Sequence, residues 1–191
     1  MFCDFLFATP VWGSLKEHND FSGVAEYCLQ MKDSSEGVQK SNFGGWQSEE
    51  INLEDHEAFA PVVAGIRRAF AHVMHDCKFN QDQGFKISNA WVNINGKGDL
   101  NKRHIHPLST FSGCAYVKLP EDSGSIRFFR SDSMRHYDMP EHGFHALNDW
   151  HEYKPFENQI LIFPSWVEHE VSPNQSDEPR ITIAFNLQRS S

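Results

Sequence analysis

The sequence lacks the features that mark several large classes of protein. Its four cysteines, Cys3, Cys28, Cys77 and Cys114, are far apart, so the chain has no CxxC pair for zinc or redox chemistry. Each cysteine lies among apolar neighbours, where a free thiol behaves as a small hydrophobic side chain. We therefore expect core thiols rather than disulfides, which fits a reducing, cytoplasmic location.

Signals for membranes and nucleic acids are also missing. No run approaches the ~20 apolar residues of a membrane span. The apolar start, Met1–Phe7, contains Asp4 and lacks a basic region, so we do not expect a signal peptide. Lysine and arginine number 17 against 26 acidic residues, a net charge of −9. This charge argues against binding nucleic acid through its phosphates and against docking on anionic membranes.

Internal repeats, low-complexity tracts and Pro/Gly-rich linkers are absent as well. The 191 residues suit one domain, so we expect a single domain over 1–191, with a helical part at about 1–80 and a strand-rich part at about 85–187. What the chain has in quantity is aromatic residues and histidine, with 16 Phe, 5 Trp and 11 His. The aromatics predict a dense core, and the histidines predict either metal ligands or a wet surface.

Two amphipathic helices are predicted in the first part. Apolar residues recur at helical spacing over 21–29, and Asn19 or Asp20 can cap the start of that helix. A longer helix with one apolar face is predicted over 59–77.

In the second part the apolar period changes to two, which predicts strands separated by Pro and Gly turns. Many short strands of this kind favour a β-sandwich or barrel, so the fold class is mainly β (α+β), with the N-terminal helices packed on one sheet. Residues 131–149 show little periodicity and are interpreted as an inserted loop, a kind of segment that is often functional. The predicted strands are Phe85–Asn95, Phe111–Leu119, Ser125–Arg130, Gln159–Phe163 and Arg180–Leu187.

Three histidines in two segments form a candidate metal site. His104 and His106 alternate in an extended segment and therefore share a face, while His169 follows the apolar strand over 160–163 and a turn. If the two segments lie side by side, three imidazoles converge, and imidazole suits iron, zinc, copper and nickel. The alternative interpretation is that these are ordinary polar residues at strand ends.

Arg180 and Thr182 share a face of the last predicted strand. A guanidinium beside a hydroxyl suits a carboxylate, because Arg grips it with two parallel hydrogen bonds. The alternative is a surface ion pair of Arg180 with Glu178 or Asp177.

With these residues the chain resembles the iron(II)/2-oxoglutarate dioxygenases, in particular a small branch with prolyl-hydroxylase-like architecture. The resemblance covers about residues 5–187. The segments that carry it are Ser41–Ser48, Trp91–Ile94, Gly98–Pro107, Ser112–Val117, Phe163–His169 and Arg180–Asn186.

The resemblance implies a double-stranded β-helix, a jelly-roll barrel over about 85–187 whose open end holds Fe(II). It implies an oxidoreductase that oxidises, typically hydroxylates, its substrate with O2 while 2-oxoglutarate is decarboxylated to succinate. His104 and His169 would be metal ligands. Arg180 would bind the far carboxylate of 2-oxoglutarate, assisted by Thr182, and Asn93 or Tyr116 would line the cosubstrate pocket.

One residue departs from the family pattern. The resemblance predicts a carboxylate two residues after the first histidine, and His106 stands there. Our first choice is a three-histidine site of His104, His106 and His169. Alternatively Asp99 could supply the acidic ligand, or His106 could turn away and leave a position for water or an anion.

Two other functions share this fold. In a cupin-type metalloenzyme that does not use 2-oxoglutarate, Gly98 to His104 and Pro164 to His169 match the motif spacings, but Trp166 stands where glycine belongs. A non-catalytic barrel that binds a metal or a small molecule is the third hypothesis. The substrate would be a small molecule or a peptide, and a homodimer is one option for the assembly.

Overall fold

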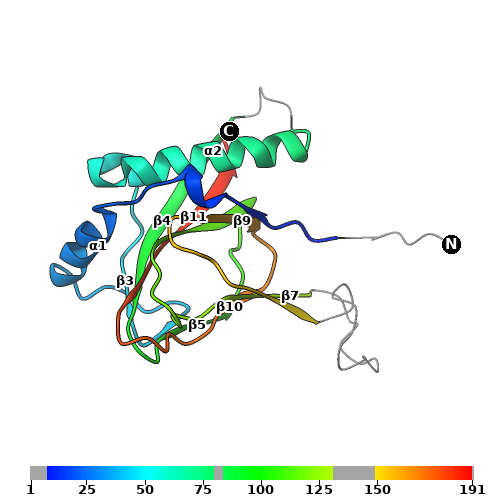
Figure 1. The fold of residues 1–191 in the computed structure, drawn as a ribbon. Coiled ribbons are helices and arrows are strands. Elements are labelled where there is room, and N and C mark those ends of the chain that lie inside the picture. Colours follow the sequence, from blue (N-terminus) through cyan, green and yellow to red (C-terminus); the bar gives the residue numbers. More distant parts are fainter. Residues whose placement is uncertain (1–7, 80–83, 131–148, 191) are drawn as a thin grey trace.

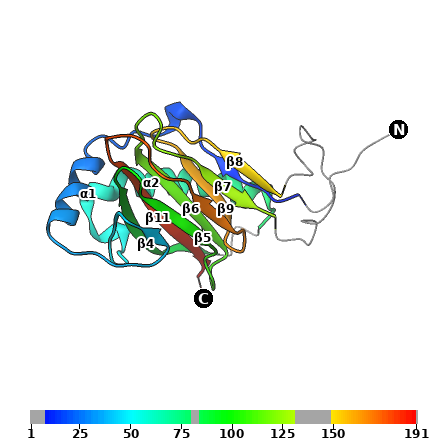
Figure 2. The same ribbon diagram turned by 90° about the horizontal axis from the view of Figure 1, so that it is seen from below.

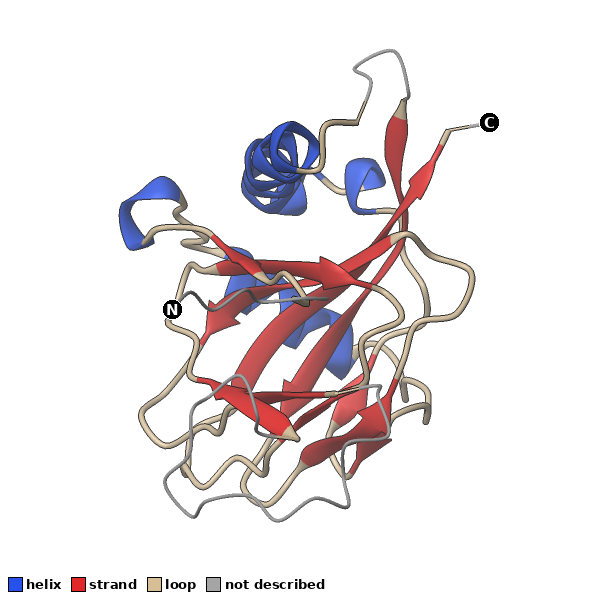
Figure 3. Ribbon diagram, turned by 90° about the vertical axis from the view of Figure 1, so that its right-hand side faces the viewer, coloured by secondary structure: helices blue, strands red, loops and turns tan. Residues whose placement is uncertain are grey.

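Two antiparallel sheets make up most of the structure, a computed structural model that describes residues 8–79, 84–130 and 149–190. The first sheet has the strand order β1-β9-β6-β11-β4-β3, and the second has the order β2-β5-β10-β7-β8. The sheets face each other in Figures 1 and 3. The strands are β1 (Trp12–Gly13), β2 (Asn42–Phe43), β3 (Trp46–Gln47), β4 (Phe85–Asn95), β5 (Leu100–His104), β6 (Phe111–Lys118), β7 (Ile126–Phe129), β8 (Trp150–Tyr153), β9 (Ile160–Pro164), β10 (His169–Val171) and β11 (Arg180–Arg189).

The path of strands β4 to β11 is that of a double-stranded β-helix. The chain passes from β4 in the first sheet to β5 in the second, returns to β6, crosses to β7 and β8, and returns again to β9 before β10 and β11. In the view of Figure 2, from below, the strands of the second sheet lie in front of those of the first. The jelly-roll prediction is therefore confirmed, in the form of two facing sheets among the described residues rather than a closed barrel.

The N-terminal helices cover the outer face of the first sheet, as predicted. Helix α2 (Ala60–Asp76) lies across the strands in Figure 1 and contacts β9 and β1, while the shorter α1 (Val24–Asp33) contacts β4 and β6. Pro61 lies in the first turn of α2, where its missing N–H has no helical partner to lose. The buried side of α2 joins the apolar side chains of the first sheet in one core cluster. Short 3-10 helices lie at Lys16–His18, Leu53–Asp55 and Glu57–Phe59.

All five predicted strands are present, and each end lies within about two residues of its predicted position. The strands that were not predicted individually, such as β5, β8 and β10, are short and rich in polar residues. Each is too short for an alternation of apolar and polar residues to be recognised in the sequence. Pairing with neighbouring strands, rather than the intrinsic β-propensity of their residues, forms them.

Three of the sequence predictions need correction or limits. Neither Asn19 nor Asp20 caps α1: its N-cap is Gly23 in the left-handed region, and Asp20 accepts a hydrogen bond from the Ser22 N–H before the helix begins. Of the described cysteines, all of them free, Cys28 is buried and Cys77 is exposed at the end of α2, so Cys77 is not a core thiol. Cys3 lies outside the described residues, and so does the predicted loop at 131–149 except for Asp149. Among the helices that the structure describes, none is long and apolar enough to span a membrane.

The stability of the fold should depend on the buried side of α2. Ile66→Ala should lower the free energy of unfolding by about 2–5 kcal/mol, because Ile66 is fully buried between α2 and the sheet. The matched control is His72→Ala on the exposed side of the same helix, which should change stability by less than about 0.5 kcal/mol. Urea denaturation followed by circular dichroism measures both, and equal losses would contradict this packing.

Candidate metal centre

Strand pairing in the second sheet brings the first and third histidines together. In the antiparallel pairing of β5 with β10, His104 lies directly opposite His169. His106 follows two residues after His104, and its N–H donates to the Ser165 carbonyl at 3.1 Å, which holds the segment against the turn after β9. The candidate ligand atoms of His104, His106 and His169 all lie within 4.8 Å of one another. The convergence of imidazoles expected from the sequence is therefore present.

Each imidazole uses Nδ1 for a hydrogen bond that orients the ring. Nδ1 of His104 lies 2.6 Å from the Lys102 carbonyl, and Nδ1 of His169 lies 2.9 Å from the Val167 carbonyl. Nδ1 of His106 lies 2.6 Å from Oδ1 of Asn186. A carbonyl oxygen can only accept, so in each ring Nδ1 carries the proton and Nε2 keeps its lone pair. Three Nε2 lone pairs are thus available to one ion, and partners of this kind orient metal-bound histidines.

Burial keeps all three imidazoles neutral. Loss of hydration lowers the pKa of His104, lowers that of His106 to about 4, and lowers that of His169 to about 3. The neighbouring imidazoles lower the pKa of His169 further, because each would repel a second positive charge. Neutral imidazole is the form that binds metal, so the site is prepared for a cation at neutral pH.

The two alternative ligand arrangements are not found. Oδ2 of Asp99 accepts from the Gly96 N–H at 2.7 Å in the turn before β5, and Asp99 is not part of the histidine cluster. His106 does not turn away, because its ring lies 5.1 Å from the ring of His169, centroid to centroid. The slot in which the family pattern predicts a carboxylate holds an inward-facing imidazole.

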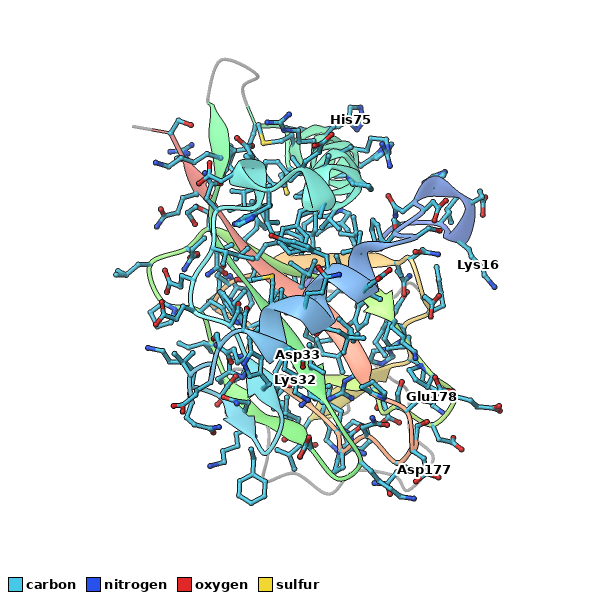
Figure 4. All side chains as sticks on the ribbon, turned by 90° about the vertical axis from the view of Figure 1, so that its left-hand side faces the viewer. Lys16, Lys32, Asp33, His75, Asp177 and Glu178 are labelled. Atoms are coloured by element: carbon cyan, nitrogen blue, oxygen red, sulfur yellow. The ribbon has the colours of Figure 1, made fainter. Side chains whose placement is uncertain are left out.

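Arg180 is buried beside this cluster, with only 2% of its surface exposed. Its Nη1 donates to the carbonyls of Ser123 and Ser172, whereas its Nη2 is buried without a partner. The surface ion pair expected as the alternative is not formed. Glu178 pairs with Lys118 and Asp177 with Lys97, and Figure 4 shows both acidic side chains at the outside of the molecule. An unpartnered buried guanidinium nitrogen is costly unless an anion binds there.

The other predicted cosubstrate residues lie beside Arg180 because of strand register. Thr182 of β11 pairs with Asn93 of β4 on one side and with Tyr116 of β6 on the other, so the three side chains share the inner face of the sheet. Oδ1 of Asn93 is buried without a partner. Burial raises the pKa of Tyr116 well above its usual value of 10, so its hydroxyl keeps its proton and can donate.

One inner cavity joins these groups to the histidines. It has a volume of about 50 Å3 and is lined by His104, His106, His169, Arg180, Thr182, Asn93 and Tyr116 among others. A larger outer cavity of about 780 Å3 shares Ser41, Trp91, His104 and His106 with it. His104 and His106 therefore stand at the boundary between the small inner cavity and the larger outer one, while His169 lines only the inner cavity.

Three residues at the site were not predicted from the sequence. Asn186, Ser112 and Ser165 form a buried hydrogen-bonded set that ends on His106. Asn186 shares the alternating face of Arg180 and Thr182, and that alternation was the signal that could have found it. Of the aromatic residues, Trp91 lines both cavities and Trp166 is exposed.

The buried neutral histidines should make the metal-free protein sensitive to mild acid. The unfolded chain takes up a proton at His169 as the pH falls below about 6.5, while the folded protein resists protonation down to about 3. The contribution of this residue to stability is complete above pH 6.5 and is lost progressively below it. Between pH 7 and pH 5, wild type should lose roughly 1–2 kcal/mol more than His169→Gln in urea denaturation with a chelator present. Equal losses in the two proteins would show that His169 protonates as readily when folded.

Comparison with known proteins agrees with this geometry. Residues 89–186, about half of the chain, match the family model described as "Putative 2OG-Fe(II) oxygenase". Among curated proteins, none matches the sequence.

Solved structures of similar fold come from the same group of enzymes. A prolyl-4-hydroxylase of Pseudomonas putida is 16% identical with a TM-score of 0.63, over 96% of this chain and 94% of that one. HygX of Streptomyces hygroscopicus, with nickel and 2-oxoglutarate bound, is 10% identical with a TM-score of 0.61, over 94% and 83%. The viral collagen prolyl hydroxylase of Paramecium Bursaria Chlorella virus-1, a 2-oxoglutarate complex, is 14% identical with a TM-score of 0.55, over 95% and 96%. These likenesses show the double-stranded β-helix fold, and the family match shows that the chain belongs to the 2OG-Fe(II) oxygenases, which are oxidoreductases that use Fe(II), 2-oxoglutarate and O2.

Proposed function

We propose that this oxygenase holds Fe(II) with His104, His106 and His169 and binds 2-oxoglutarate through Arg180, to oxidise a small-molecule or peptide substrate. One observation carries the proposal: three Nε2 lone pairs and the unpartnered Nη2 of buried Arg180 line a single cavity. The first group suits a borderline transition metal and the second suits a carboxylate.

The donor set fits the cofactors of the family. When bound, Fe(II) with 2-oxoglutarate supplies the activation of O2 for substrate oxidation, typically hydroxylation, with succinate and CO2 as the other products. The residues of the chain would bind and orient these groups and exclude water from them. The three histidines present neutral imidazoles. Nη1 of Arg180 is bonded to backbone carbonyls, and its Nη2 remains free to donate to an oxygen of the far carboxylate.

Neighbours of Arg180 complete the cosubstrate pocket. Thr182 and Tyr116 offer hydroxyl groups on the same inner face, and the carboxamide of Asn93 offers a further hydrogen bond from the adjacent strand. The inner cavity, of about 50 Å3, is the smaller of the two cavities that meet at His104 and His106.

We propose that the substrate occupies the outer cavity. That cavity is much larger, and it is lined by His104 and His106 but not by Arg180. The side chain of Gln47 lines it, and Oε1 of Gln47 is buried without a partner, which would suit a substrate with an N–H or O–H donor. One protein of similar fold is in complex with a peptide fragment and another has hygromycin B bound, which supports both a peptide and a small molecule as substrate classes.

Two alternatives have different support. A cupin-type enzyme would not need Arg180, so the unpartnered Nη2 argues against it. A non-catalytic barrel is favoured only by the missing carboxylate ligand, since the other groups of the site are in place.

A cytoplasmic location remains our proposal, and it is supported by the free thiols of Cys28, Cys77 and Cys114. The homodimer stays a prediction.

Arg180→Ala should weaken 2-oxoglutarate binding on the order of 10- to 100-fold, because the charge-assisted hydrogen bonds to its carboxylate are lost. Binding of Co(II), a redox-stable substitute for Fe(II), should remain, because Arg180 is not a ligand. Isothermal titration of 2-oxoglutarate into the Co(II) protein measures the effect. Arg180→Lys keeps the positive charge but removes the planar guanidinium, so it tests whether parallel hydrogen bonds to the carboxylate are needed. The matched control is Arg67→Ala. Arg67 lies on α2 and forms an exposed ion pair with Glu54. Unchanged affinity in a folded Arg180→Ala protein would remove Arg180 from the cosubstrate site.

Activity is tested by anaerobic loading with Fe(II) and 2-oxoglutarate, followed by addition of O2 and measurement of succinate. Wild type should form succinate even without substrate, at a slow uncoupled rate. His169→Ala should bind no stoichiometric iron and form no succinate, because the most buried of the three ligands is missing. Iron bound by wild type without 2-oxoglutarate binding would favour the cupin-type enzyme. Binding of both without succinate, across a panel of peptides and small molecules, would favour the non-catalytic barrel.

A further inference from the structure

We propose that Asn186, supported by Ser112, is the positioning residue that makes His106 a metal ligand in the slot where the family pattern predicts a carboxylate. The inference deepens the proposed function and rests on it for the metal. Its basis is a row of hydrogen-bonded side chains that crosses three strands of the first sheet and ends on the His106 ring.

The row is built by strand register. Asn186 of β11 lies directly opposite Asn89 of β4 and directly opposite Ser112 of β6. Nδ2 of Asn186 donates to Oδ1 of Asn89 at 2.9 Å, and Oγ of Ser112 donates to Oδ1 of Asn186 at 2.7 Å. Oδ1 of Asn186 also lies 2.6 Å from Nδ1 of His106. One carboxamide therefore connects the two neighbouring strands to the imidazole.

The orientation of the Asn186 carboxamide follows from this network. Its nitrogen faces the carbonyl oxygen of Asn89, so its oxygen faces both Ser112 and His106. Turning the amide over would place two carbonyl oxygens, which can only accept, together at Asn89. His106 must therefore carry its proton on Nδ1 and direct the lone pair of Nε2 toward the other two histidines.

A second contact holds the backbone of the same residue. Oγ of Ser112 lies 2.7 Å from Oγ of Ser165, and the Ser165 carbonyl accepts from the His106 N–H at 3.1 Å. The ring and the backbone of His106 are thus tied to one buried cluster. Asn186, Ser112 and Ser165 are each at most 5% exposed, so water competes little for these bonds.

The chemistry of the partner matters as much as its position. A carboxamide is neutral, so it orients the imidazole without adding the negative charge that a carboxylate partner would bring to the site. The protein ligands then contribute no charge, and the bound ion keeps its +2 for an anionic cosubstrate. Replacement of Asn186 by Asp would keep the acceptor for Nδ1 but would place a negative charge next to the ligand.

The first measurement is the tautomer of His106 in the metal-free protein at pH 7, by two-bond 1H–15N correlation with labelled histidine. Wild type should show His106 protonated on Nδ1. Asn186→Ala should shift His106 toward a mixture or toward the Nε2–H form. His104 and His169 serve as internal controls, because their Nδ1 atoms face backbone carbonyls and should not change. Wild-type His106 protonated on Nε2 would overturn the proposal.

The second measurement is Co(II) affinity by equilibrium dialysis. Asn186→Ala should lose about 10- to 100-fold, and Ser112→Ala should lose less. Asn186→Asp should keep the Nδ1–H tautomer and recover most of the Co(II) affinity, while weakening 2-oxoglutarate binding to the Co(II) protein. The matched control is Asn174→Ala, another buried asparagine with hydrogen bonds far from His106. It should lower thermal stability without a selective loss of Co(II).

Several results would overturn the assignment of Asn186. The tautomer and the Co(II) affinity could both be unchanged in Asn186→Ala, or Asn174→Ala could lose Co(II) affinity equally. Wild type that binds no Co(II) would instead refute the proposed metal site, and the NMR result would still decide whether Asn186 sets the tautomer. If Asn186→Ala does not fold, Ser112→Ala still tests the loss of Co(II) affinity, and Asn186→Asp still tests the weakened 2-oxoglutarate binding; no change in either variant would overturn the proposal.

Discussion

The pairing of β5 with β10 is the contact on which the site depends. It places His104 opposite His169, although 64 residues, which include β6 to β9, lie between them in the chain. Two imidazoles brought together in this way repel each other when protonated, and their burial makes protonation costly. Backbone hydrogen bonds of the sheet hold the two histidines in place. The stability of the fold therefore offsets the unfavourable burial of imidazoles that a bound cation would stabilise.

The central strand β11 organises the other half of the site. Its alternate residues face inward: Arg180 and Thr182 line the inner cavity, and Asn186 contacts the His106 ring. Because β11 pairs along most of its length with β4 and β6, these side chains have little freedom to shift. Helix α2 packs on the outer face of the same sheet and shares its apolar core.

Much of this arrangement could be predicted from the sequence, and the limits have physical reasons. Long apolar strands such as β4 and β11 were predictable because alternation over many residues is a strong signal. The identities of the three histidines and Arg180 followed from residue chemistry and from resemblance. The ring tautomers could not be predicted, because they depend on acceptors such as Asn186 that are distant in sequence. The burial of Arg180 could not be predicted either, since Asp177 and Glu178 nearby in the chain offered an equally plausible partner until the structure paired them elsewhere.

The electrostatic balance connects the composition of the chain to its chemistry. A protein with a net charge of −9 repels a dianion at long range, so binding 2-oxoglutarate requires concentrated local positive charge. In the proposed site Arg180 would supply one charge, and its burial would strengthen its attraction for a carboxylate because little water screens it. With His106 in place of a carboxylate, the protein ligands add no negative charge, so an ion of charge +2 would remain uncompensated until the cosubstrate binds. The same replacement that departs from the family pattern therefore makes the anionic cosubstrate the main source of negative charge at the centre. Bound metal should therefore raise the affinity for 2-oxoglutarate, and bound 2-oxoglutarate the affinity for metal. This mutual effect should be larger in this protein than in a site whose ligands include a carboxylate.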